Sequence, residues 1–61
     1  MTRKDYVLIA AALKAAMGHA EGVPEAQGGI ERAALELCSI LAANNPRFDR
    51  ERFLRAATLQ H

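Results

Sequence analysis

The chain has 61 residues, which allows one small domain and no more. Apolar residues make up 51% of it and aromatic residues only 5%, so the apolar content is mostly Ala and Leu, which favour helices. The net charge is +1, far from the strong positive excess of many nucleic-acid-binding domains. No apolar stretch approaches the ~20 residues that span a bilayer. Composition therefore predicts one all-α domain, residues 1–61, located in the cytoplasm and not in a membrane.

The stability of so short a chain is predicted to be marginal. Area scaling suggests that it buries ~60% of its unfolded surface, or about 5,700 Å². If roughly 60% of this area is apolar, burial stabilises the fold by ~85 kcal/mol, against ~90 kcal/mol for ordering the chain. Cys38 is the only cysteine, so no internal disulfide can add stability. Association of two copies is the remaining source of additional stability, and we expect a homodimer.

Two segments with helix-breaking residues divide the chain, GHAEGVPEAQGG at residues 18–29 and NNP at residues 44–46. They predict a compact bundle of three short helices. The expected helices span about residues 3–17, 24 or 29 to 43, and 50–59.

The ends of the first two helices carry local signals. Thr2 is a candidate N-cap with Asp5 three residues later, a variant of the capping box, and Gly18 suits the left-handed position that closes a helix. The start of the second helix is left open. Pro24 suits a first helical position, but Gly28 and Gly29 would then lie inside the helix at ~1 kcal/mol each.

Helical periodicity predicts which face of each helix packs in the core. The expected core residues are Tyr6, Ile9, Leu13, Ala16 and Met17 in the first helix, Ile30, Ala33, Ala34, Leu37, Ile40 and Leu41 in the second, and Phe53, Leu54 and Ala57 in the third. Cys38 lies near the edge of the second face, where we expect a small buried thiol.

The stretch NNPRFDRERFLRAA, residues 44–57, predicts how the third helix begins. With Asp49 as N-cap, Phe48 precedes the cap and Phe53 is the fourth helical residue, which are the two positions of a hydrophobic staple. Pro46 stops the second helix, and Asn44 or Asn45 can adopt the left-handed closing conformation.

A second apolar strip lies on the first helix, roughly opposite its core face. It consists of Leu8, Ala12 and Ala15, and its small residues would let another backbone approach closely. An alternative is that these alanines are simply good helix formers in an exposed position. With the arginines Arg47, Arg52 and Arg55 of the C-terminal segment, the strip supplies the candidate partner-binding residues.

The arginines also raise the alternative of a nucleic-acid-binding regulator that presents Arg50, Arg52 and Arg55 to a DNA groove. Segment charges argue against it, because they are +2 for residues 1–20, −3 for 21–43 and +2 for 44–61. Phosphate binding depends on clustered, uncompensated positive charge. Pairing of the basic third helix with the acidic second, within or between chains, is an equally good explanation.

Catalytic, metal and cofactor sites are not predicted. Ser39 lies next to Cys38, but His19 falls in a glycine-flanked loop and His61 is the last residue, so no base is placed beside a nucleophile. The two histidines and the cysteine have no metal-ligand spacing. A glycine-rich loop between a strand and a helix is also absent. We therefore expect a protein that is not an enzyme.

Residues 43–57, ANNPRFDRERFLRAA, together with the N-terminal MTRKDYVLIAAAL, resemble a group of small helical proteins encoded by phages, prophages and other mobile elements. Most members of that group have no assigned function. The resemblance implies an origin in a mobile element and a role in the cytoplasm of a bacterial host. By analogy with other small helical proteins of that origin, we expect contact with a host protein, such as a defence or transcription component. A further alternative is a structural accessory piece whose partner is another phage protein. The shared motif coincides with the cap and staple residues, so the similarity also fits a common way of folding.

Overall fold

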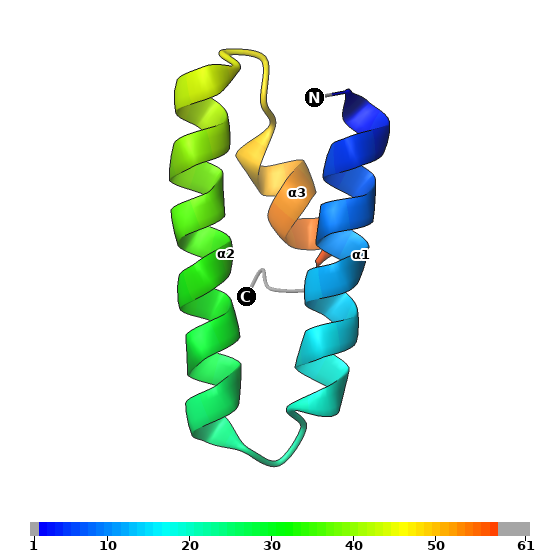
Figure 1. Cartoon of the computed structure of the whole chain (residues 1–61), viewed down its shortest axis with the longest axis vertical. Coiled ribbons are helices and arrows are strands. Elements are labelled where there is room, and N and C mark those ends of the chain that lie inside the picture. Colours follow the sequence, from blue (N-terminus) through cyan, green and yellow to red (C-terminus); the bar gives the residue numbers. More distant parts are fainter. Residues whose placement is uncertain (1, 58–61) are drawn as a thin grey trace.

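The computed structural model of the protein describes residues 2–57. They form three α-helices: α1 (Arg3–His19), α2 (Pro24–Asn44) and α3 (Arg50–Ala56). The two long helices α1 and α2 form an antiparallel hairpin (Figure 1). The short helix α3 lies between the N-terminal half of α1 and the C-terminal half of α2, and it contacts both. The predicted all-α fold of three helices is confirmed.

The N-terminus of α1 is capped as predicted. The Asp5 carboxylate accepts a hydrogen bond from the backbone N–H of Thr2 at 2.8 Å and one from the Thr2 hydroxyl at 3.3 Å. The backbone bond stabilises the charged carboxylate and holds the pKa of Asp5 below its ordinary value. The cap therefore contributes most when this carboxylate is ionised.

The predicted end of α1 at Gly18 is wrong. The helix continues to His19, and Ala20 closes it at φ −93°, with its N–H bonded to the Ala16 carbonyl at 3.0 Å. The residue with positive φ is Gly22, at +83°. It occupies the third position of a turn closed by the Val23 N–H and the Ala20 carbonyl, where a left-handed conformation is required. The chain thus uses a left-handed glycine for the reversal, three residues after the last helical residue.

Of the two starts left open for α2, the structure has the earlier one. Pro24 is the first helical residue, and the Gln27 N–H closes the first turn on the Val23 carbonyl at 3.0 Å. Gly28 and Gly29 lie inside the helix. Each costs ~1 kcal/mol relative to alanine, and the many residues of α2 that pack beyond them offset this.

The predicted left-handed ending of α2 at Asn44 or Asn45 is also wrong. Asn44 is the last helical residue, and its side-chain amide donates to the Ile40 carbonyl at 2.9 Å. Asn45 is extended, at φ −144° and ψ 105°. Pro46 explains this, because the ring of a proline pushes the preceding residue toward the extended region.

Both features predicted for the start of α3, the N-cap at Asp49 and the staple between Phe48 and Phe53, are confirmed. The Asp49 carboxylate accepts from the Arg52 N–H at 3.0 Å, and the rings of Phe48 and Phe53 lie 5.4 Å apart between centroids. The helix ends at Ala56 with Ala57 as its C-cap. Residues 58 and 59, which we expected to be helical, lie outside the described part of the chain.

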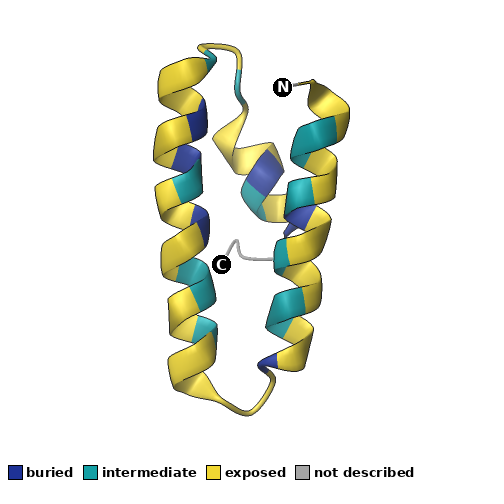
Figure 2. Cartoon of the chain, viewed as in Figure 1, coloured by how far each residue is buried: buried dark blue, intermediate teal, exposed yellow. Residues whose placement is uncertain are grey.

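The core is small and lies where α3 meets the hairpin. Its buried residues are Ala10, Ala34, Cys38, Leu41, Phe53 and Ala57. Half-buried around them are Tyr6, Ile9, Leu13, Met17, Leu37, Phe48 and Leu54. Figure 2 shows that the fully buried positions of the helices gather around α3, whereas the half of the hairpin near the α1–α2 loop is mostly half-buried or exposed.

Two residues of the predicted α2 face were assigned wrongly. Ala33 is exposed, and Ile40 is 59% exposed. The centre of the buried face runs through Ala34, Cys38 and Leu41, which share one side of a helix, and Ile40 lies about 120° from it. The buried position of Ala10 on α1 was missed. Small residues at these places let three helices approach each other closely.

Candidate functional site

The second apolar strip of α1 is exposed, as the helical wheel predicted. Leu8 is 60% exposed, and Ala12 and Ala15 are also exposed. We call these three residues the outer α1 strip. Val7, 56% exposed, lies on the same helix between this strip and the side of α1 that faces α3. The described helices therefore leave the strip uncovered, and its role as an interface stays a prediction.

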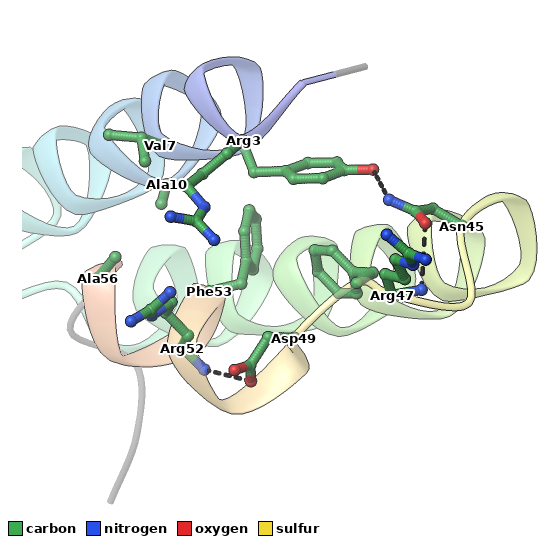
Figure 3. Close-up of a pocket in the computed structure, with 11 residues that line it drawn as sticks. Arg3, Val7, Ala10, Asn45, Arg47, Asp49, Arg52, Phe53 and Ala56 are labelled. Carbon is green, nitrogen blue, oxygen red and sulfur yellow. Dashed lines mark hydrogen bonds between the residues drawn. The ribbon is translucent and has the colours of Figure 1, made fainter.

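A groove of about 240 Å³ opens between α1 and α3, and we call it the α1–α3 groove. Three segments contribute to it: α1, the linker after α2, and α3 (Figure 3). Its lining residues are Arg3, Tyr6, Val7, Ala10, Asn45, Arg47, Phe48, Asp49, Arg52, Phe53 and Ala56. The floor is apolar and aromatic, and the charged residues belong to α1, the linker and α3.

The aromatic floor of the groove is held by specific contacts. The rings of Tyr6 and Phe48 meet edge to face, with centroids 5.1 Å apart and planes at 70°. Phe48 in turn packs against Phe53. The Tyr6 hydroxyl accepts a hydrogen bond from the Asn45 side-chain amide at 3.0 Å, and the Asn45 side-chain oxygen accepts from the Arg47 N–H at 3.1 Å. These bonds tie the linker to α1 and fix one end of the groove.

The charged residues of the groove are mainly cationic. Arg3 extends from α1 toward α3, Arg52 lies on α3, and Arg47 lies at the linker end near Asn45 (Figure 3). Within residues 2–57, none of these three guanidinium groups forms an ion pair, and the only acidic lining residue, Asp49, caps α3. The groove thus combines an apolar floor with positive charge that lacks a partner.

Sequence reasoning identified only part of this groove. Arg47 and Arg52 were candidates and both line it, whereas Arg55 is exposed on α3 and does not. Arg3 was missed because it lies far from Arg47 in the chain. A local signal existed, since Arg3 precedes Tyr6 by about one helical turn.

Within residues 2–57, the structure shows no ion pair between basic α3 and acidic α2. One ion pair joins Arg32 to Glu36 at 3.3 Å, along the exposed side of α2 itself. Pairing between two chains stays a prediction.

Cys38 is a buried thiol, as predicted, at 1% exposure. Burial raises its pKa because the thiolate would lose solvation, and the positive charge of Arg50 opposes this only in part. A protonated, enclosed thiol is a poor nucleophile. No group of three or more His, Cys, Asp or Glu side chains in residues 2–57 is placed to hold a metal ion, and His61 lies outside those residues.

Comparison with known proteins adds no relative: no family model, no curated protein and no solved structure matches the chain. What the fold and surfaces define is a small three-helix protein with one exposed apolar helix strip and one cationic, apolar-floored groove. None of the three helices is long and apolar enough to cross a membrane.

Proposed function

We propose that this protein acts by contact with other proteins, without catalysis, and that it forms a homodimer through α1, or through α1 and α2 together. The observation that carries the proposal is the outer α1 strip, where Leu8 is 60% exposed beside the exposed Ala12 and Ala15. Exposed apolar surface of this kind is typical of interaction sites. Alanine also lets a second helix backbone approach closely.

The marginal stability expected of a 61-residue chain without a disulfide supports association as well. A dimer that covers Leu8 removes apolar surface from water at about 25 cal/mol per Å². The gain would add directly to the stability of each folded chain, because only the folded state associates.

A bacterial host, a cytoplasmic location and an origin in a phage or other mobile element belong to the proposal. They rest on the resemblance of residues 43–57 to the small mobile-element proteins. The partner would then be a host protein, such as a defence or transcription component, or another protein of the same element.

Nucleic-acid binding through α3 is the alternative. Its support is the group of arginines on and before α3. Its weakness is the length of α3, seven residues or about 10 Å of helix, with Phe53 buried and Leu54 half-buried against the hairpin. A recognition helix needs more free length to follow a major groove.

The test is solution mass by light scattering over a dilution series, at low and high salt, with and without a DNA duplex. We expect wild-type protein to be a dimer whose mass is unchanged by DNA, and Leu8→Glu to be a monomer of lower stability. The matched control is Val23→Glu, an exposed apolar residue of the α1–α2 loop, which should remain a dimer. An unchanged mass and stability in Leu8→Glu would refute the dimer through α1. A mass that shifts only with DNA at low salt would establish the alternative.

A further inference from the structure

We infer that the α1–α3 groove binds an acidic segment of a partner protein, with one aliphatic side chain of that segment seated on the groove floor and its carboxylates on the arginines. This inference rests on the proposed function, protein contact, and adds the partner's chemistry at a surface distinct from the outer α1 strip.

The charge of the groove selects the class of partner. Arg3, Arg47 and Arg52 line one small groove, and none of them has a carboxylate partner within residues 2–57. Asp49 cannot neutralise them fully, because it brings one negative charge against three guanidinium groups. Guanidinium groups bind carboxylates through paired, charge-assisted hydrogen bonds. Glutamate or aspartate side chains on both sides of an anchor residue would complement this arrangement.

The size and lining of the groove floor indicate which kind of side chain of the partner would bind there. The groove volume of about 240 Å³ lies below the range of about 300–1,000 Å³ typical of small-molecule sites, so it suits one or two side chains. Val7 of α1 and Ala56 of α3 supply exposed aliphatic surface, one from each helix. An aliphatic side chain placed there would bury the exposed part of Val7, which is now 56% exposed.

A nucleic acid fits the same groove less well. Bases bind single-strand sites by stacking on open aromatic faces. Here Phe53 is only 4% exposed, and Phe48 is packed between Phe53 and Tyr6. Because these rings pack against one another, they leave little open aromatic surface on which a base could stack. Three cations on a chain of net charge +1 also give a weak phosphate-binding field.

The protein carries its own probe for the test. Tyr6 is the only tyrosine, the chain has no tryptophan, and Tyr6 lines the groove. Its fluorescence and its ring NMR signals therefore report occupation of this groove. We would titrate the full chain with a short peptide that has one leucine flanked by glutamates. Parallel titrations would use the peptide with alanine for leucine, the peptide with lysines for glutamates, and a single-stranded DNA oligonucleotide.

We expect the Glu–Leu peptide to shift the Tyr6 signals and to bind more weakly as salt rises, and the three control ligands to bind at least tenfold more weakly. Arg3→Gln and Arg52→Gln should each weaken it by about tenfold, the usual effect of losing one hydrogen bond to a charged group. The matched control is Lys14→Gln, an equal change of charge on α1 outside the groove, which should leave the affinity unchanged within about twofold. Val7→Ser should weaken binding of the leucine peptide and not of its alanine version.

Three results would overturn the inference. The first is an unchanged Tyr6 signal at millimolar peptide, and the second is tighter binding of the oligonucleotide than of the peptide. The third is equal weakening by Lys14→Gln and Arg52→Gln, which would reveal general charge attraction. Leu8→Glu separates this inference from the proposed dimer, because it should abolish the dimer and leave peptide binding intact. A persistent dimer without peptide binding would refute the groove alone.

Discussion

Truncation of Phe53 should be the most damaging single change in the described core. The side chain is 4% exposed and packs among Ala10, Cys38 and Leu41, with its ring 5.4 Å from Phe48. Replacing a buried phenylalanine by alanine costs about 3–5 kcal/mol, which approaches the whole stability of a domain this small. Phe53→Ala should therefore be largely unfolded at room temperature.

A graded series makes the prediction measurable. Phe53→Leu keeps most of the apolar volume and loses the ring contact, so we expect a loss of about 1–2 kcal/mol. Because 1 kcal/mol shifts the Tm of a 60-residue domain by about 4–8 °C, the Tm should fall by about 5–15 °C. Phe48→Ala, at a half-buried position with two ring partners, should cost about 1–3 kcal/mol. The measurement is urea and thermal unfolding followed by circular dichroism at the helix band.

The matched control is Leu35→Ala, a truncation of a residue on α2 that is 43% exposed. Its cost should stay below about 1 kcal/mol, since little apolar surface is buried there. Equal unfolding curves for Phe53→Ala and Leu35→Ala would show that α3 is not packed against the hairpin. The staple and the α1–α3 groove would then both be wrong.

Three further predictions concern helix stability and ionisation. Gly28→Ala and Gly29→Ala should each stabilise the protein by about 0.5–1 kcal/mol, because both residues are helical and an added Cβ meets no atom within 4 Å; a lowered Tm in either would contradict this. Asp5→Asn should lower the Tm at neutral pH and lose this effect once the pH is below the folded pKa of Asp5. The reason is that folding lowers the pKa of Asp5. The ionised carboxylate therefore stabilises the folded state above the unfolded-state pKa of about 4, and this stabilisation is lost as the pH falls through the folded-state pKa. The raised pKa of Cys38 predicts slow reaction of the thiol with maleimide at pH 8 and a rate that climbs with urea; a rate equal to that of a free thiol in the absence of urea would show that the core is open.

Much of the local structure could be predicted from the sequence because its signals act over a few residues. The cap at Thr2, the cap at Asp49 and the staple between Phe48 and Phe53 are relations between positions three to five apart. Asn45 was predicted to be left-handed because asparagine tolerates that region. Pro46 restricts the residue before it to the extended region, and this restriction prevails. That constraint is equally local, so this error could have been avoided.

The sequence by itself therefore determined the helix count, the N-terminal caps of α1 and α3, and the exposed apolar strip at Leu8. Only the tertiary structure decided which side of α2 faces inward and where the arginines meet. Helical periodicity shows which arc of α2 is apolar but does not locate the centre of the buried face within that arc. Whether Cys38 or Ile40 is buried therefore depended on where α1 and α3 pack against α2. Arg3 and Arg52 line the same groove because the chain returns past its own start, a relation between distant residues that no spacing within one helix encodes.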